Sequence, residues 1–232
     1  MFVVSTLMAL FCSVVTAADV APLVTVKPLG VTSIRLVEGF KPVSVFDGAN
    51  GTPIGELRST AVVHGAVTQL VWSQSDKKEH PIDLTKGTIE TSYEQRSVQY
   101  TVEQDGFVQL AFSGPTHGFW VRKTDLGDRG VQSWAHYISG LKDVLWREEL
   151  AGTPLHERPD ETSPVKVLPD GFYAPTPTGT VQGDFLEVKI QAYDDHFQCG
   201  GEGKPTGQPL TGWVRGATRD GKPQIWHYTR GC

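Results

Sequence analysis

The sequence predicts a mainly β protein assembled from two versions of one small unit. Glycine and proline are frequent, with 25 and 15 among 232 residues, and they separate short stretches in which apolar and polar residues alternate. This pattern is typical of many short strands. A similar aromatic strand also occurs twice, as Phe119-Trp120-Val121 and as Gly212-Trp213-Val214. We therefore expect one β unit over residues 18–126 and a second over residues 150–232.

The first unit contains the clearest strand and turn signals. Residues 41–47 and 52–57 resemble strands on either side of Asn50-Gly51, a dipeptide that strongly favours a tight hairpin. Residues 66–72 and 106–112 favour two more strands, and a turn at 113–116 leads into the strand with Trp120. The polar residues 73–80 are expected to form a long loop or an elaborated hairpin, part of an insertion over residues 59–99.

The amino terminus has the pattern of an export signal. Residues 1–17 are uncharged and apolar or small, and Val15 and Ala17 have the small side chains that signal peptidase requires. We expect cleavage before Ala18, a periplasmic or secreted protein, and no membrane span after cleavage. The first lysine is Lys27, so the usual positive charge of a signal is missing. The alternative is a lipoprotein anchored at Cys12, although bulky Phe11 precedes this cysteine.

Residues 19–36 follow the signal and alternate around two prolines, Pro22 and Pro28. Proline lacks a backbone N–H and is confined to edge strands or strand starts. The segment is therefore predicted to be an extended leader or an edge strand.

A linker with a short helix is expected between the units, over residues 127–149. Gly127-Asp128-Arg129-Gly130 has the composition of a linker. After it, apolar residues recur at helical spacing at 134, 138, 141 and 145, with Gly140 weakening the pattern. The apolar face of this helix is predicted to pack between the units rather than to bind a ligand. Cutting at residues 127–130 is expected to leave two pieces that fold separately.

The second unit repeats the order of the first. Residues 153–159 and 164–168 are expected to be strands joined by a turn, and residues 183–190 alternate cleanly. The proline-rich residues 169–178 are expected to be irregular and exposed. The unit is predicted to end in a tight hairpin, in which the strand with Trp213 turns through Asp220-Gly221 into the strand with Trp226.

Two cysteines remain once the signal is removed, Cys199 and Cys232. In an oxidising compartment they are most simply one disulfide that ties the carboxyl terminus to the preceding loop. A zinc site formed with His196 and His227 is the alternative, but the spacings fit no usual zinc pattern. We expect no metal and no cofactor.

The net charge and the absence of known motifs argue against a nucleic-acid-binding protein and against several classes of enzyme. The formal net charge of -5 gives no electrostatic reason to expect nucleic acid as a partner. The sequence contains no Gly-x-Ser-x-Gly or His-Glu-x-x-His motif, and phosphate loops and dinucleotide fingerprints are absent.

The repeated unit resembles bacterial SH3-like domains in tandem, which are small barrels found in exported envelope proteins. The resemblance has four parts in each unit: an apolar opening strand with a nearby proline turn (Val43–Phe46 with Pro53; Leu155–Pro159), a turn of small residues, an aromatic strand (Gly106-Phe107; Asp184-Phe185), and the closing strand with Trp120 or Trp213. It implies two SH3-like barrels and an exported, non-catalytic protein that recognises peptidoglycan or a peptide or protein partner of the envelope.

Four aromatic residues are the candidates for ligand binding. Trp120 and Trp213 occupy matching strands, where a role in the core is the alternative. Trp226 and Tyr173 lie beside polar or proline-rich residues, where an aromatic ring can serve as a ligand platform or can cover the disulfide.

The rival hypothesis is a cell-envelope hydrolase or transpeptidase that uses Cys199 and His227. Cysteine amidases with SH3-like domains carry Asp-Cys-Ser-Gly, whereas this chain has Gln198-Cys199-Gly200-Gly201. Thr116-His117-Gly118 is similar to the Ser-His-Gly of cysteine transpeptidases, but Phe119 stands where their nucleophilic cysteine lies. No catalytic residue is therefore assigned, and a free thiol at Cys199 in the unreduced protein would favour the enzyme.

Overall fold

The computed structural model describes residues 27–74, 78–112, 114, 118–127, 130–142, 144–146, 154–168, 171–195 and 202–227. The expected signal sequence, Cys12, Cys199 and Cys232 lie outside these residues. Over these residues the protein is mainly β, as predicted, with 59% in strands and 6% in helices. The described strands form a ten-stranded sheet, a five-stranded sheet and a two-stranded sheet.

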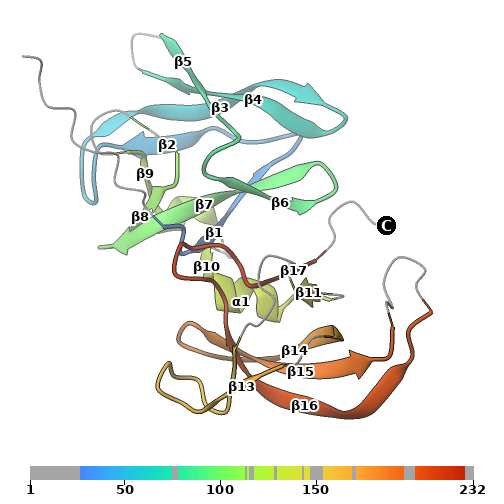
Figure 1. The fold of residues 1–232 in the computed structure, drawn as a ribbon. Coiled ribbons are helices and arrows are strands. Elements are labelled where there is room, and N and C mark those ends of the chain that lie inside the picture. Colours follow the sequence, from blue (N-terminus) through green and yellow to red (C-terminus); the bar gives the residue numbers. More distant parts are fainter. Residues whose placement is uncertain are drawn as a thin grey trace, which may run out of the picture.

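The ten-stranded sheet contains the amino-terminal half of the described chain (Figure 1). Its strand order is β10-β1-β7-β8-β9-β2-β3-β4-β5, and β6 pairs with β7. The strands are β1 (Gly30–Leu36), β2 (Val43–Phe46), β3 (Pro53–Val63), β4 (Ala66–Ser73), β5 (Glu79–Ile82), β6 (Thr88–Ser92), β7 (Gln95–Gln104), β8 (Phe107–Leu110), β9 (Trp120–Arg122) and β10 (Val131–Ser133). A short 3-10 helix, η1 (Lys123–Leu126), follows β9.

The predicted turn at Asn50-Gly51 is confirmed. Asn50 has a φ of 59°, β2 and β3 pair antiparallel on either side of it, and Gly51 N–H donates to the carbonyl of Gly48. The strands predicted at residues 66–72, at 106–112 and at Trp120 also form, as β4, β8 and β9.

The prediction of an extended leader or edge strand at residues 19–36 is wrong for its described part. β1 lies inside the large sheet and pairs with β10 on one side and β7 on the other. Pro28 precedes the strand, so every residue of β1 keeps its backbone N–H and can pair with both neighbours.

The five-stranded sheet has the order β13-β12-β16-β15-β14. Its strands are β12 (Pro154–His156), β13 (Val165–Val167), β14 (Phe172–Gln182), β15 (Phe185–Tyr193) and β16 (Pro205–Arg215). Within the described residues, neither this sheet nor the larger one closes into a barrel, since each strand order runs between two free edges.

Two predictions for this half are wrong. Residues 172–178 belong to β14 rather than to an irregular loop, and β14 accommodates Pro175 and Pro177 because it is an edge strand with a single partner, β15. The expected terminal hairpin also differs. A turn forms at Gly221, but the next strand, β17 (Ile225–His227), pairs with β11 (Val144–Trp146) instead of returning along β16.

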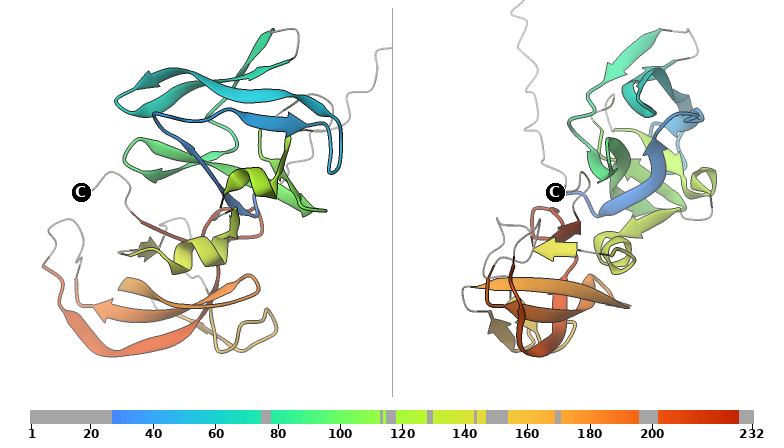
Figure 2. Two further views of the ribbon diagram at one scale, coloured as in Figure 1. Left: turned by 180° about the vertical axis from the view of Figure 1, so that it is seen from behind. Right: turned by 90° about the vertical axis from the view of Figure 1, so that its right-hand side faces the viewer.

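The predicted helix is α1 (Trp134–Ser139), and it lies between the two large sheets (Figures 1 and 2). The hydroxyl of Ser133 caps its first turn, and it ends at Gly140, so residue 145 falls on β11. The helix contacts β1 and β10 of the ten-stranded sheet and β14 and β15 of the five-stranded sheet. Its buried residues, Trp134, Ala135 and Ile138, join a core cluster with Val31 and the inner residues of the five-stranded sheet.

Candidate ligand-binding site at the junction of the two sheets

The four aromatic residues predicted to bind a ligand lie at different places in the fold. Trp120 is only 8% exposed and packs with Phe46 and Phe107. Trp213 is half-buried on β16, opposite Glu187 of β15 and His156 of β12. Trp226 and Tyr173 both pack against the second core cluster. The structure therefore does not gather the four residues into one site.

Trp226 is part of an aromatic group that holds α1 in place. Its ring stacks on Tyr137, with ring centres 5.6 Å apart, and meets Trp134 edge to face at 5.9 Å. Such pairs contribute about 0.5–1.5 kcal/mol beyond the burial of their surface. The ring thus stabilises the contact between β17 and the helix.

His227, the histidine of the rival enzyme hypothesis, is half-buried at the end of β17. Its Nε2 lies 3.2 Å from the carbonyl oxygen of Thr91, and its Nδ1 is buried with no hydrogen-bond partner among the described residues. Cys199 and the His117 motif lie outside the described residues, so a cysteine and histidine pair stays a prediction.

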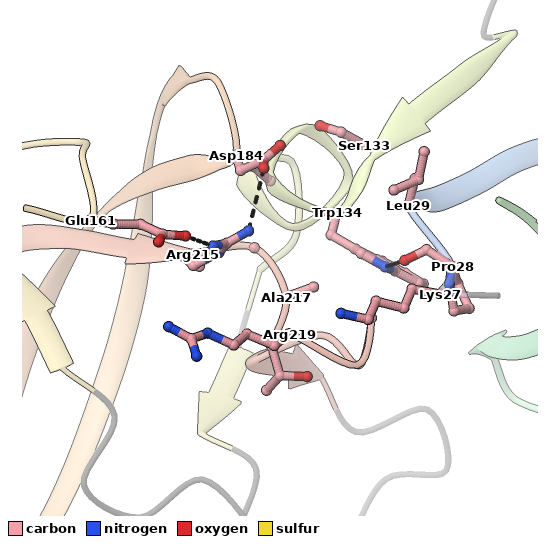
Figure 3. Close-up of a pocket in the computed structure, with 14 residues that line it drawn as sticks. Lys27, Pro28, Leu29, Ser133, Trp134, Glu161, Asp184, Arg215, Ala217 and Arg219 are labelled. Carbon is pink, nitrogen blue, oxygen red and sulfur yellow. Dashed lines mark hydrogen bonds and ion pairs between the residues drawn. The ribbon is translucent and has the colours of Figure 1, made fainter. Parts of the chain in front are cut away.

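A cavity of about 400 Å³ lies where the two halves meet (Figure 3). We call it the junction pocket. Residues 27–29 and 133–135 line one side, and Glu161, Asp184, residues 215–219 and Gly221 line the other. Sites of ligand size range from about 300 to 1,000 Å³ and occur preferentially where domains meet. The junction pocket has this size and this position.

Trp134 fixes the first wall of the junction pocket. Its indole Nε1–H donates to the carbonyl of Pro28 at 3.0 Å, and its backbone N–H donates to the carbonyl of Leu29 at 3.2 Å. The side chain is only 3% exposed. The start of α1 therefore holds the segment before β1 in one position.

Two glycines let the second wall approach the first. A Cβ at Gly216 would lie 2.3 Å from the backbone nitrogen of Ala135, and a Cβ at Gly221 would lie 2.7 Å from the carbonyl oxygen of Pro28. Gly221 also has a φ of 82°, a conformation that favours glycine. The contact between the halves thus depends on residues without a side chain.

The acidic residues of the junction pocket are neutralised within it. Arg215 forms ion pairs with Glu161 and, at 3.4 Å, with Asp184, and its guanidinium lies 6.0 Å from the centre of the Phe185 ring. Figure 3 shows Arg215 directed at both carboxylates. Arg215 thus joins β16 to the loops before β13 and β15.

Two cations of the junction pocket remain available. Neither Lys27 nor Arg219 forms an ion pair or a side-chain hydrogen bond with another residue that the structure describes. Figure 3 draws both side chains at the pocket, with no dashed line at either charged end. The lining therefore carries a net positive charge in a protein whose formal net charge is -5. An anionic group, such as a carboxylate, matches this arrangement.

The turn beside the junction pocket has a fixed charge of its own. A hydrogen bond from the Thr218 hydroxyl is the main cause that lowers the pKa of Asp220, and Lys222 lies 3.7 Å from the same carboxylate. Asp220 is thus ionised at neutral pH and pairs with Lys222. Arg219, which lies between Thr218 and Asp220, forms no ion pair with Asp220 or with any other residue that the structure describes.

The sequence indicated aromatics as ligand residues and missed these basic residues. Lys27 and Arg219 come from opposite ends of the described chain, and no local pattern links them. The one available signal was Arg215-Gly216 after the aromatic strand, because glycine next to a strand end permits close approach of another segment. In the described residues no group of three or more acidic, histidine or cysteine side chains is placed to hold a metal.

The fold and the junction pocket define a mainly β protein with a ligand-sized cavity between its two halves. Comparison with protein-family models, curated proteins and solved structures finds no match to the chain. None of the helices in the described ranges is long and apolar enough to cross a membrane.

Proposed function

We propose that the protein is an exported, non-catalytic binding protein that holds a carboxylate-bearing ligand in the junction pocket. The observation that carries the proposal is a pair of cations, Lys27 and Arg219, that have no ion-pair partner among the described residues and lie beside a cavity whose acidic residues are bound to Arg215. Lys27 and Arg219 are both exposed, so each ion pair with a ligand carboxylate contributes about 0.2–1 kcal/mol. Together the two contacts favour an anionic ligand over a neutral one.

The resemblance of both halves to SH3-like domains directs the proposal to the cell envelope. Each half would be a variant of that small β unit, with the sheets extended and joined through α1. Peptidoglycan fits the chemistry because its stem peptides carry free carboxylates on a neutral glycan. A peptide of an envelope protein with a free carboxyl terminus has the same recognition group. We also propose that the protein is exported to the periplasm or the medium, and that Cys199 and Cys232 form a disulfide there.

Sedimentation of the mature protein with insoluble peptidoglycan tests the proposal. The double variant Lys27→Gln/Arg219→Gln is expected to bind at least tenfold more weakly than the unmodified protein. The matched control is Lys166→Gln/Lys189→Gln, which removes the same charge from exposed positions on the five-stranded sheet. Binding should also weaken as salt is raised, because the cations lie near the protein surface.

A short acidic peptide with a free carboxyl terminus separates the two ligand sources. If it binds in calorimetry and peptidoglycan does not, the ligand is a peptide and the glycan version is wrong. If neither probe binds, or if both double variants lose binding equally, the junction pocket is not the binding site and the proposal fails.

A further inference from the structure

A second cavity, of about 300 Å³, lies on the ten-stranded sheet beside α1, and every residue that lines it is polar. We call it the hydroxyl pocket. Six of its nine lining residues carry a hydroxyl group: Thr32, Ser33, Thr91, Ser92, Ser97 and Tyr137. Two others carry an amide, and the last is Arg35. Binding sites are usually lined mainly by apolar side chains, so a wholly polar lining indicates a strongly polar ligand.

The hydroxyl pocket arises from an irregularity in the pairing of β1 with β7. Val31 pairs with Gln99 and Arg35 pairs with Ser97, so three residues of β1 face one residue of β7. The extra residues turn away, and the backbone N–H of Ser33 donates to the carbonyl of Gly130 at 2.9 Å. Strand bulges of this kind often redirect side chains at functional sites.

The floor of the hydroxyl pocket is held by hydrogen bonds inside the protein. Thr32 donates from its hydroxyl to the carbonyl of Val98 at 3.0 Å and accepts from the backbone N–H of Ile34 at 3.2 Å. The hydroxyls of Thr91 and Ser97 lie 2.9 Å apart, and Ser97 is only 4% exposed. These groups are therefore preorganised, and each retains acceptor or donor capacity toward the cavity.

The rim of the hydroxyl pocket has unused donors. Arg35, Ser92, Gln95 and Gln132 form no side-chain hydrogen bond or ion pair with another described residue. Arg35 is exposed and is the only charged residue of the lining. Tyr137 forms one wall, and its ring is kept in place by the stack on Trp226. The rim thus offers one guanidinium with amide and hydroxyl groups around it.

We infer that the hydroxyl pocket is a binding site for an acidic monosaccharide unit. A sugar ring presents several hydroxyls, each able to donate and to accept, which matches the hydroxyl and amide groups of the lining. A carboxylate on that ring gives Arg35 the planar partner that a guanidinium binds with two parallel hydrogen bonds. The inference does not depend on the junction pocket, since the two cavities share no residue.

Titration calorimetry with three probes tests the inference on the mature protein. Glucuronate supplies hydroxyls and a carboxylate, glucose supplies hydroxyls alone, and acetate supplies the carboxylate alone. Glucuronate is expected to bind at least tenfold more tightly than glucose or acetate. Arg35→Gln should lower its affinity at least tenfold, whereas Lys189→Gln, which removes one exposed charge elsewhere, should leave it unchanged.

A second variant distinguishes the hydroxyl pocket from the junction pocket. In Lys27→Gln/Arg219→Gln the glucuronate binding that depends on Arg35 should remain. The inference would be overturned if that variant lost glucuronate binding, or if Arg35→Gln bound glucuronate as tightly as the unmodified protein. It would also be overturned if the unmodified protein did not bind glucuronate at millimolar concentration. Amide shifts in a nuclear magnetic resonance titration should include Gln95 and Gln132, and shifts confined to other regions would contradict it as well.

Discussion

The ten-stranded and five-stranded sheets differ in the origin of their cores. All 15 buried residues of the first core cluster lie between Ile34 and Leu126, within the chain segment that forms the ten-stranded sheet. The second cluster has 11 buried residues, and only five of them, Leu155, Leu186, Val188, Ile190 and Val214, belong to the five-stranded sheet. The other six come from β1, α1, β11 and β17.

This difference shows that the two halves are not equivalent folding units. The ten-stranded sheet supplies its own core, whereas the five-stranded sheet completes its core with the helix and with Val31 of its neighbour. A sheet without enough apolar surface of its own needs another element to cover it. The junction is thus part of the second core.

The largest effect is expected when the second half is separated from α1. A fragment of residues 150–232 lacks Val31, Val144 and the three buried residues of α1, so it should be unfolded by circular dichroism. A fragment of residues 131–232 keeps the helix and β11 and should show a cooperative transition. Cooperative unfolding of the shorter fragment would show that the five-stranded sheet supports itself.

Trp134→Ala should cost about 3–5 kcal/mol of unfolding free energy, the usual result of removing a buried tryptophan. Trp134 lies in the second cluster and donates to the carbonyl of Pro28, so hydrogen exchange should increase in the second half and in residues 28–31. The control is Leu110→Ala in the first cluster, which should increase exchange in the ten-stranded sheet. Identical exchange patterns for both variants would contradict the division into two cores.

Reduction of the predicted disulfide between Cys199 and Cys232 should act on the second half alone. The chain-entropy estimate for the loop between these residues is about 3.7 kcal/mol. Hydrogen exchange with and without reductant is the measurement, and faster exchange is expected after about residue 185. Equal loosening of both halves, or no change, would show that the disulfide or the two-part division is wrong.

Gly216→Ala should cost about 1–3 kcal/mol, because the added methyl group would enter the backbone of α1. The predicted contact to the backbone nitrogen of Ala135 is 2.3 Å. Gly179→Ala is the control for a glycine-to-alanine change that makes no new contact, since a Cβ there has no neighbour within 4 Å. The φ of 90° at Gly179 means that this control also includes local backbone strain. Thermal melts of both variants measure the difference, and a smaller loss at Gly216 would argue against a tight junction.

The smallest expected effect concerns the pH dependence of the two cores. Burial raises the pKa of Tyr100, in the first cluster, to about 12, and burial also raises the pKa of Tyr137, beside the second. Tyrosines of the unfolded chain ionise near pH 10, so the unfolded state loses protons first and the unfolding free energy falls between about pH 10 and 12.

Urea denaturation at about pH 9 and 11 measures this fall. The loss of unfolding free energy between these two pH values should shrink most in Tyr100→Phe and less in Tyr137→Phe. Tyr93→Phe is the control, because Tyr93 is exposed. An unchanged fall in Tyr100→Phe would show that this group does not control the alkaline transition.

Local signals in the sequence were enough to predict the strands and several turns. Asn50-Gly51 predicted its hairpin because asparagine tolerates the left-handed conformation, and Asn50 adopts it with a φ of 59°. The apolar spacing at residues 134 and 138 likewise predicted α1, but the helix ends at Gly140 and does not continue to residue 145 as that spacing indicated. The predictions were wrong where the structure of a segment depends on which strand it pairs with. The prolines of β14 indicated a loop, but an edge position tolerates them, and the edge position follows from the sheet as a whole.

The candidate site was less predictable than the fold. Trp120 and Trp213 were selected because no catalytic motif was found and they occupy matching strands of the two units, yet Trp120 is buried and neither lines the junction pocket or the hydroxyl pocket. Lys27, Arg35 and Arg219 are ordinary basic residues in the sequence. Their proposed roles depend on which neighbours lack a partner, and this is visible only once distant segments are brought together.

The pairing of β11 with β17 imposes an order on the maturation of the protein. Val144 pairs with His227, so the second core cannot be completed until the segment that contains β17 has been synthesised. The ten-stranded sheet needs nothing beyond Ser133 for its strands and can assemble on an unfinished chain. During that interval the apolar residues of α1 are uncovered, because β14 and β15 have not yet docked. A chain halted in this interval is therefore the species most prone to aggregate and most in need of a chaperone.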